Sequence, residues 1–302
     1  MSAWPSVGVV IPTRNRPEQL GQAIASVLAQ NYEGQIQVII VFDGTPADQT
    51  LADGDRVLVI GNDRTPGLAG ARNCGILATR CEFVAFCDDD DKWRPGKLRS
   101  QVAAMRASAG AEFSSCGIVV TFEGKSTDRL AGTEQVTRQD LIRSRMVMVH
   151  SSTYLASRAA LLDGIGLVDE TIPGGQNEDW DLALRAAARR PIVHVDKPLV
   201  EVAWGSGSHY ETQWLTKAQG LLWMLEHHGD LVNSQAGAAR VYAQLAFAYA
   251  CLGDRSESCR WIGRALRHNA LEPRVPFAAA VAAGMVSGDR VLRTLHARGR
   301  GI

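Results

Sequence analysis

The first half of the chain alternates short apolar runs, rich in Val and Ile, with segments whose apolar residues recur at helical spacing. The runs with strand character cover residues 7–11, 37–42, 57–60 and 83–87. The spacing predicts one helix that begins near Pro17 and two further helices at residues 69–79 and 95–107. Such alternation forms βαβ units, so it predicts an α/β fold of Rossmann type, with a mainly parallel sheet and helices on both faces.

The alternation weakens after residue 110. In this part we expect strands at residues 118–122, 152–156 and 192–195 and a helix at residues 178–189. From about residue 212 the sequence becomes alanine-rich and almost purely helical. We therefore expect two parts, an α/β domain at residues 1–210 and a helical C-terminal region at 211–302.

One segment of the helical region, residues 243–273, resembles a tetratricopeptide-like hairpin of two helices. Its turn is expected at Leu252, Gly253 and Asp254. Only one such unit is visible in the sequence, whereas a solenoid needs about three repeats. A capping hairpin is therefore favoured over a binding array, and its apolar surface could pair with a second copy of the chain to form a homodimer.

Composition excludes several classes of protein. Lys and Arg number 32, as do Asp and Glu, so the chain lacks the basic excess of a nucleic-acid-binding protein. The six cysteines form no CxxC pair, which favours free thiols in a reducing cytosol over zinc or disulfides. We find neither an apolar stretch of membrane-spanning length nor a signal-peptide pattern, so we expect a cytoplasmic protein, with peripheral membrane contact left open.

Polar residues follow each of the first four predicted strands. The segments are PTRNR at 12–16, FDGT at 42–45, NDRTPGLAGARN at 62–73 and DDDD at 88–91. Any one of them would fit a solvated loop. In open α/β sheets, however, ligands bind at the carboxyl ends of the strands. The coincidence of four polar segments at four successive strand ends therefore indicates a ligand site at that edge.

The four consecutive aspartates, Asp88 to Asp91, need a positive partner, because neighbouring carboxylates repel and are costly to bury unpaired. The chain has neither a GxxxxGK[ST] loop nor a GxGxxG loop after a strand, so two common phosphate cradles are absent. A divalent cation held by carboxylates is another way to hold a diphosphate, and Mg²⁺ or Mn²⁺ suits oxygen ligands. It would also neutralise charge on a departing diphosphate.

Five segments of the chain resemble family 2 glycosyltransferases of the GT-A fold. In order they are VGVVIPTRNRPEQLGQAIASVLAQ, VIIVFDGT, GLAGARNCGI, FVAFCDDDDKWRPGKL and NEDWDLALRA. They keep the order and approximate spacing of the family, and together they cover roughly residues 5–205. The resemblance implies a hexosyltransferase that uses a nucleotide-sugar donor. The helical C-terminal region lies outside it.

The resemblance also implies roles at the donor site. It assigns donor binding to the PTR segment, with the residues Pro12, Thr13 and Arg14. Asp43 matches the acid that contacts the nucleotide base, although the family often has two acids there and this chain has Phe42 in the first place. Arg72 matches a basic position lining the donor site, and a surface helix arginine is the alternative.

Within the acidic run, Asp88 and Asp90 match the D-x-D pair of the family, and Asp90 matches its metal ligand. Asp88 or Asp89 would face the ribose or a metal-bound water. With four acids in a row, this assignment can shift by one residue. His209 could supply a late histidine ligand to the metal, as in several GT-A enzymes, or it could be an ordinary surface histidine.

The NEDW segment matches the motif that holds the general base of the family. Asp179 matches the base itself, and Glu178 would orient the acceptor or support Asp179. One carboxylate near the attacking hydroxyl is sufficient, because the nucleotide diphosphate is already a good leaving group. One base and in-line attack imply inversion. The structural alternative is that these are first-turn acids, which the helix dipole favours.

These features predict a metal-dependent, inverting transfer of a sugar to a hydroxyl acceptor. The resemblance favours UDP as the carrier, while dTDP and GDP stay open. A glycan, a lipid-linked glycan and a small molecule all fit as acceptors, and the polar stretch 125–150 could form an acceptor loop. A nucleotidyltransferase is a second hypothesis, although no glycine-rich signature follows the first strand. A non-catalytic carbohydrate-binding module is the third.

Overall fold

The computed structural model describes residues 4–203 and 213–297. Within these residues, ten strands form one mixed sheet. The strands are β1 Val7–Thr13, β2 Ile36–Phe42, β3 Val57–Gly61, β4 Phe83–Phe86, β5 Lys92–Trp93, β6 Phe113–Phe122, β7 Lys125–Arg129, β8 Gln135–Val136, β9 Leu155–Ser157 and β10 Ile192–Ala203. Their order across the sheet is β3-β2-β1-β4-β9-β6-β10-β5, with β7 paired to β6 and β8 paired to β10.

Strands β3, β2, β1 and β4 run parallel to one another, as do β6 and β10. β9 lies between these two groups and is antiparallel to both of its neighbours, β4 and β6. This topology brings the carboxyl ends of the first four strands to one edge of the sheet. The predicted α/β fold with a mainly parallel sheet is therefore confirmed.

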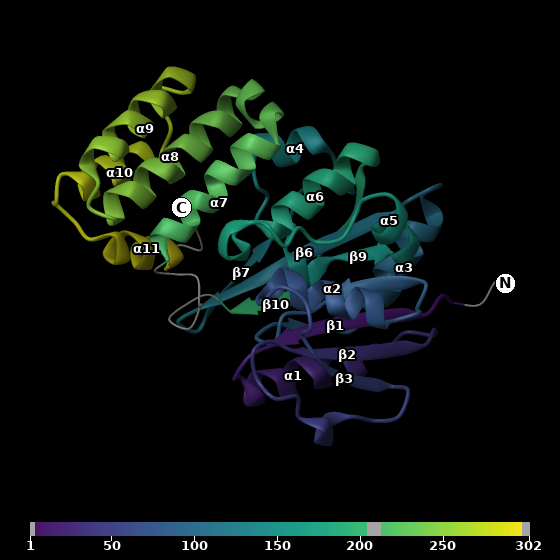
Figure 1. Cartoon of the computed structure of the whole chain (residues 1–302). Coiled ribbons are helices and arrows are strands. Elements are labelled where there is room, and N and C mark those ends of the chain that lie inside the picture. Colours follow the sequence, from purple (N-terminus) through teal and green to yellow (C-terminus); the bar gives the residue numbers. More distant parts are fainter. Residues whose placement is uncertain (1–3, 204–212, 298–302) are drawn as a thin grey trace.

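Six helices of the α/β part cover both faces of the sheet (Figure 1). They are α1 Pro17–Leu28, α2 Leu68–Ala78, α3 Lys97–Ala107, α4 Arg138–Arg143, α5 Arg158–Asp163 and α6 Glu178–Arg189. The alternation of side chains along β1 decides which helices pack on which face. Val9 and Ile11 share a core with Leu20 of α1. Val10, between them, belongs to the opposite core with Ile76 of α2.

The C-terminal region consists of α7 Trp214–His227, α8 Gln235–Cys251, α9 Arg255–His268, α10 Val275–Ala282 and α11 Gly288–His296. Within the segment of the predicted hairpin, α8 and α9 meet at a turn where Gly253 has a φ of 81°. The Ser258 hydroxyl donates to the Ala246 carbonyl at 2.9 Å and fastens the two helices together. No described helix has the length and apolarity that a bilayer crossing requires.

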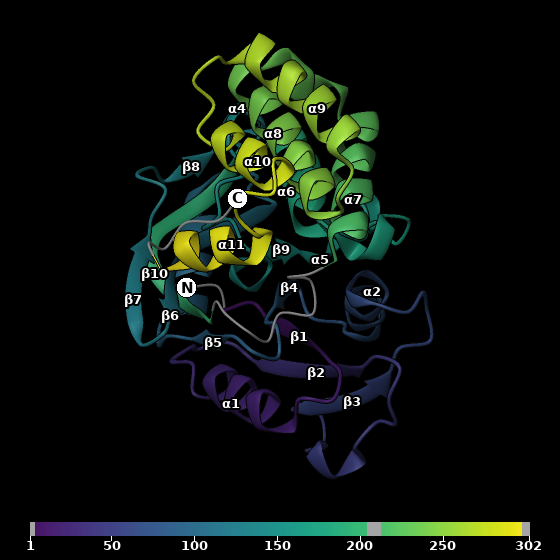
Figure 2. The same ribbon diagram turned by 90° about the vertical axis from the view of Figure 1, so that its left-hand side faces the viewer.

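The C-terminal helices gather beside α4 and α6, away from β1–β3, in both views of the molecule (Figures 1 and 2). Trp180 and Leu184 of α6 share one apolar core with Leu245 and Phe247 of α8. The predicted boundary near residue 210 falls outside the described residues, and the division into two domains stays a proposal. The shared core shows that the helical region packs directly on the helix that carries the NEDW segment.

Two local predictions differ from the structure. The strand expected at 118–122 begins five residues earlier, at Phe113, as part of β6. The strand expected at 152–156 is instead a 3₁₀ turn at Ser151–Thr153 followed by the short strand β9. In this turn the Ser152 hydroxyl accepts from the Asp88 backbone N–H and donates to Asp91, and its carbonyl accepts from the Trp93 indole. The polar stretch 125–150 contains β7, β8 and α4.

Candidate active site

The polar segments after β1, β2 and β4 meet at the edge of the sheet, as expected. Asp43 donates its backbone N–H to the Thr13 carbonyl at 2.9 Å, which joins the ends of β1 and β2. The Thr13 hydroxyl donates to Asp89 Oδ2 at 2.8 Å and joins β1 to the acidic run. All three residues are buried. The topology therefore places three of the predicted donor-site residues in one connected group.

The Asp43 carboxylate is held by its own chain on one oxygen. Asp43 Oδ1 accepts from the Asn62 amide at 2.8 Å and from the Gly67 backbone N–H at 3.0 Å. Among the described residues, none donates a hydrogen bond to Oδ2. Gly67 has a φ of 120° just before α2, a conformation that favours glycine and lets the N–H point at the carboxylate. Asp43 is thus oriented with one oxygen available for a ligand.

Pro12 and Arg14 flank Thr13 in different environments. Pro12 is buried in β1, in register with Val41 of β2, and carries no polar side-chain atom. Its part in the site is therefore to shape the end of the strand. Arg14 is exposed, and its Cζ lies 3.7 Å from the point where a Cβ at Gly44 would sit. A Cβ at Gly44 would be in ordinary van der Waals contact with this guanidinium.

Arg16 forms ion pairs with the two middle acids of the acidic run. Its Nη1 lies 3.0 Å from Asp89 Oδ1 and 2.6 Å from Asp90 Oδ2. The Asp90 side chain is 41% exposed, whereas that of Asp89 is 8% exposed. Burial raises the pKa of Asp89, and the hydrogen bond from Thr13 works in the opposite direction. Asp90, the predicted metal ligand, is therefore paired with an arginine of the same chain.

The other two aspartates of the run face a serine-rich turn. Asp88 Oδ2 accepts from the Ser151 hydroxyl at 2.8 Å, and Asp91 Oδ2 accepts from the Ser152 hydroxyl at 2.5 Å. Burial, followed by the charges of Asp88 and Asp90, raises the pKa of Asp91 well above its ordinary value. A buried carboxylate with this much like charge around it is a position where a cation would be stabilising.

One group of side chains could hold a metal ion: Asp88, Asp91 and His150 each offer a ligand atom, and these atoms lie within 4.8 Å of one another. His150 Nδ1 lies 3.6 Å from Asp91 Oδ2. Two carboxylates and an imidazole suit Mn²⁺, and carboxylates suit Mg²⁺. The predicted metal ligands were Asp90 and His209. Asp90 is not in this group, and His209 lies outside the described residues, so the group differs from the predicted ligands.

The NEDW segment begins α6, and both of its acids are buried. Arg145 Nη2 lies 2.8 Å from Asp179 Oδ1 and 2.9 Å from Oδ2. The Trp180 backbone N–H donates to Asp179 Oδ1 at 2.8 Å. Burial alone would raise the pKa of Asp179, but Arg145, followed by His150 and the Trp180 N–H, outweighs burial and lowers it. Asp179 is therefore ionised at neutral pH.

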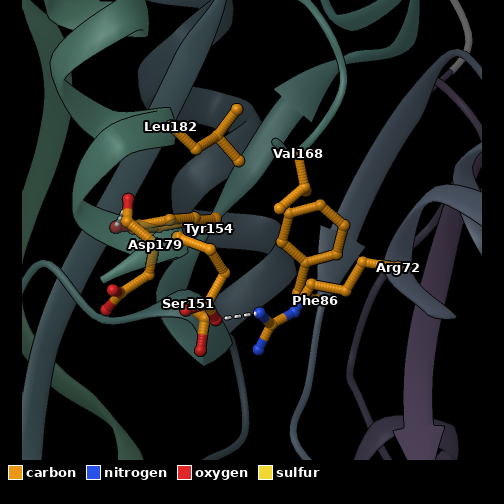
Figure 3. A pocket seen from close by; sticks show the side chains of 8 residues that line it. Arg72, Phe86, Ser151, Tyr154, Val168, Asp179 and Leu182 are labelled. Atoms are coloured by element: carbon orange, nitrogen blue, oxygen red, sulfur yellow. Dashed lines mark hydrogen bonds and ion pairs between the residues drawn. The ribbon is translucent and has the colours of Figure 1, made fainter. Parts of the chain in front are cut away.

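Arg72 links the acidic run to the NEDW segment. It is 2% exposed, and it lies 2.6 Å from Asp88 Oδ1 through Nη2 and 2.5 Å from Glu178 Oε1 through Nη1. Burial raises the pKa of Glu178 to about 7, although Arg72 opposes the rise. Arg72, Ser151 and Asp179 line one narrow pocket together with Phe86 and Tyr154 (Figure 3). Arg72 thus joins two acidic segments that are far apart in sequence, and the pocket beside it is lined by the acids of the NEDW segment.

Sequence reasoning assigned no role to Arg16, and it did not identify Arg145, His150 or the serines at 151 and 152 as site residues. Arg16 stood in a recognised polar segment, so its position after the first strand was a usable signal. Arg145 lies 34 residues before Asp179, and no motif surrounds it. Its pairing depends on tertiary packing that spacing cannot reveal.

Curated proteins with similar sequences take part in glycan synthesis. The succinoglycan biosynthesis protein ExoO of Rhizobium meliloti is 35% identical over 154 residues, 47% of this chain and 43% of that protein. The UDP-Glc:alpha-D-GlcNAc-diphosphoundecaprenol beta-1,3-glucosyltransferase WfgD of Escherichia coli is 33% identical over 104 residues, 33% of this chain and 40% of that protein. The chain therefore matches less than half of the length of these two relatives.

A solved structure shares the fold along almost the whole chain. The S. aureus TarS fragment 1–349 in complex with UDP-GlcNAc has a TM-score of 0.61, with 98% of this chain and 92% of that chain covered at 16% identity. The sheet and its helices thus have the GT-A fold, and the match extends over the helical C-terminal region as well. A family model described as Glycosyl transferase family 2 matches residues 8–162, about half of the chain. The chain therefore belongs to glycosyl transferase family 2.

Proposed function

We propose that this protein transfers a hexosyl group from a nucleotide-sugar donor to a hydroxyl group of an acceptor, with inversion at the anomeric carbon. The observation that carries this proposal is the Arg72 bridge between Asp88 and Glu178. It sets the end of β4, where a donor diphosphate would lie, against the start of α6, where a base would lie. Transfer requires both groups around one reacting centre.

The donor is a UDP-sugar in this proposal. TarS structures hold UDP-GlcNAc and UDP, and WfgD is named for UDP-Glc. Asp43, with Oδ2 unengaged by described residues, would accept from the nucleotide base. Thr13, Asp88 and Asp89 would contact the ribose and diphosphate. Pro12, Arg14 and Arg72 complete the proposed donor-site residues.

A divalent cation, Mn²⁺ or Mg²⁺, fits the acidic run because buried like charges there lack full compensation. Asp88, Asp91 and His150 would hold it, since their ligand atoms already converge. Asp90 stays the ligand that the family resemblance implies, and it would join when Arg16 releases it. His209 stays a proposal of the same kind. When bound, the cation supplies charge neutralisation on the leaving diphosphate.

Asp179 is the proposed general base. Its low pKa keeps it ionised, and it would take the proton of the acceptor hydroxyl as that oxygen attacks. Arg145 occupies both of its oxygens, so the acceptor must displace or share this contact. Glu178, held by Arg72 one residue earlier, would keep the turn in place. A single base on one face of the sugar implies inversion.

We also propose a role in polysaccharide or glycoconjugate synthesis. One relative is named for succinoglycan biosynthesis, and another is named for a diphosphoundecaprenol acceptor. We place the reaction in the cytoplasm, where nucleotide sugars are available. Exposed Leu271 and Met285, on the loops that flank α10, would support a homodimer or a peripheral membrane contact of the C-terminal region.

A panel of UDP-, dTDP- and GDP-sugars with Mn²⁺, Mg²⁺ or EDTA tests the proposal, with UDP release and transfer to acceptor glycans as readouts. We expect Asp179→Asn to keep donor binding while its turnover collapses. Asp163→Asn removes an exposed acid at the end of α5 and should behave as wild type. Asp90→Ala should lose metal-dependent donor binding.

The outcomes separate the alternatives. Normal turnover in Asp179→Asn would remove Asp179 as the base. Equal losses of binding and rate would indicate a structural role. Formation of a nucleotide sugar from a sugar phosphate and a nucleoside triphosphate would identify a nucleotidyltransferase. Failure to bind any donor at saturating concentration would indicate a non-catalytic module. NMR shows whether the anomeric bond of the product is axial or equatorial, and comparison with the donor decides whether the transfer inverts.

A further inference from the structure

Arg240, in the middle of α8, is a buried guanidinium without an anionic partner. Its side chain is 6% exposed, and its Cζ lies 4.9 Å from the centre of the Trp180 ring. Neither Nε nor Nη2 has a hydrogen-bond partner, and no described carboxylate forms an ion pair with it. A cation–π contact recovers only part of the free energy lost when an unpaired charge is buried. An additional anion at this place would therefore be stabilising.

Two further arginines converge on the same place. Burial, followed by the charges of Arg274 and Arg145, lowers the pKa of Arg240 to about 9. Ala243, one helical turn after Arg240, packs with Val275, the neighbour of Arg274. Arg145 pairs with Asp179, the neighbour of Trp180 in the chain. Arg240 and Arg145 thus both contact the NEDW segment, and Arg274, from a third segment, lies near Arg240.

The carboxylates nearby do not balance these arginines. Asp179 pairs with Arg145, and Glu272 pairs with Arg274 at 2.7 Å. The three guanidinium groups therefore face two paired carboxylates, and the positive charge of Arg240 is left over. The side chains of Arg145 and Arg274 are 42% and 27% exposed. Arg240 is thus the buried member of this arginine cluster, and Arg145 and Arg274 are the members that reach solvent.

We propose that Arg240, Arg145 and Arg274 form a subsite for a phosphate group of the acceptor. Guanidinium groups bind phosphate through paired N–H donors, and several of them suit a group with more oxygens than a carboxylate. Within the arginine cluster, Arg145 contacts Asp179, the proposed base, and Arg240 of α8 lies beside Trp180, the next residue. The donor diphosphate is expected on the other side, beyond Arg72. The assignment of this phosphate to the acceptor rests on the proposed function.

This subsite would connect acceptor binding to the base. Arg145 belongs to the arginine cluster and also occupies both oxygens of Asp179. A phosphate that competes for Arg145 would leave an oxygen of Asp179 open to the acceptor hydroxyl. Binding of the correct acceptor would therefore prepare the carboxylate that removes its proton.

Calorimetric titration of the full chain with inorganic phosphate tests the subsite, with UDP and Mg²⁺ saturating so that the donor site is filled. We expect single-site binding to wild type, at least tenfold weaker binding to Arg240→Met, and a smaller loss in Arg274→Gln. Arg264→Met is the matched control, because it removes an exposed guanidinium 4.5 Å from the Trp261 ring and should leave phosphate binding unchanged.

Competition then identifies the source of the phosphate. A short-chain lipid diphosphate and a glycerol phosphate oligomer are each tested for displacement of inorganic phosphate, with an uncharged alkyl glycoside as the negative arm. Displacement by the diphosphate alone indicates a lipid-linked acceptor, and displacement by the oligomer indicates a phosphodiester polymer. Displacement by the glycoside would contradict a phosphate subsite.

Two results would overturn the inference: absence of phosphate binding by UDP-loaded wild type, or equal binding by Arg240→Met. If Arg240→Met does not fold, Arg240→Lys and Arg274→Gln decide the question, since both should weaken phosphate binding. UDP binding is measured in the same samples. If the wild type does not bind UDP, the result counts against the proposed function. If it binds UDP but not phosphate, the result counts against the subsite alone.

Discussion

Neighbouring carboxylates at the start of α6 differ in pKa because each has a different arginine. Arg145 forms its ion pair with Asp179, and its charge helps to outweigh burial and to lower the pKa of that carboxyl. Arg72 is shared between Glu178 and Asp88, so burial prevails at Glu178 and its pKa rises to about 7. Two acids with pKa values driven apart in this way are suited to different roles, one ionised and one able to hold a proton.

The raised pKa of Glu178 predicts a change of stability with pH. Its ordinary value is 4.5, so between about pH 4.5 and 7 the native state keeps a proton that the unfolded chain has lost. The free energy of unfolding should therefore fall as pH rises through this window, by on the order of 1–3 kcal/mol. Glu178→Gln should show a flatter dependence in urea unfolding between pH 5 and 8.

Glu170→Gln is the control for this measurement. Burial would raise the pKa of Glu170, but hydrogen bonds from Asn73, Thr65 and Arg64 lower it to about 2. Its contribution is therefore lost only as pH falls below about 4.5, outside the measured window. The same pH dependence in Glu178→Gln and wild type would show that Glu178 titrates normally.

Arg240 makes a prediction about stability that is separate from phosphate binding. Because its buried guanidinium lacks an anionic partner, Arg240→Met should remove an unfavourable charge and keep most of the packing against Trp180. In chloride buffer without phosphate, we expect the melting temperature to rise by roughly 2–4 °C, the equivalent of about 1 kcal/mol in a chain of this size. A fall in melting temperature would show that Arg240 stabilises the fold through Trp180.

At the scale of helices and strands, α2 depends on a glycine that lets it approach β1. A Cβ at Gly75 would lie 2.3 Å from Val10 Cγ1, within the apolar core. Gly75→Ala should therefore destabilise the protein by about 1–3 kcal/mol and disturb donor binding, because Arg72 is carried by the same helix. Thermal unfolding and UDP titration measure the two effects.

Gly21→Ala is the matched change in α1. Its Cβ would meet nothing within 4 Å, and the site is exposed. The substitution should raise stability by up to about 1 kcal/mol through helix propensity alone. If both glycine variants were equally stable, close packing of α2 on β1 would not be a constraint.

Elements with a strong local pattern were predictable, and those formed by long-range contacts were not. The β-branched run of β1 and the helical spacing of α1 appear in the structure as expected. The residues of β6 that follow Phe113 are Ser114, Ser115, Cys116 and Gly117, a composition without strand character that pairing with β10 overrides. The turn at Ser151–Thr153 forms because its serines bond aspartates 60 residues away.

The candidate site shows the same division. Asp43, the acidic run and the NEDW acids were predictable because each lies at a strand end or a helix start with a recognisable motif. Arg145, His150 and Arg240 come from stretches without motifs, and folding alone brings Arg145 and His150 to these acids and Arg240 to the ring of Trp180. Sequence reasoning found Arg72, which lies in a motif, but it could not supply the residues that only tertiary packing brings to the site.

At the scale of the whole molecule, the C-terminal helices and the α/β part share one core. Phe247 of α8 is fully buried in the same apolar cluster as Trp180 and Leu184 of α6. His228, just after α7, adds a polar link, because its Nε2 lies 2.8 Å from Asp181 of α6. The helical region should therefore unfold together with the site rather than as an independent unit.

Phe247→Ala tests this coupling. Removing a fully buried phenylalanine should cost about 3–5 kcal/mol. If the core is continuous, this loss lowers the stability of the entire chain, and far-UV CD and UDP binding are lost in one transition at lower urea. Phe277→Ala, at a side chain that is 37% exposed on α10, should change little. A biphasic transition, with UDP binding kept after part of the helix signal is gone, would show that the two parts fold separately.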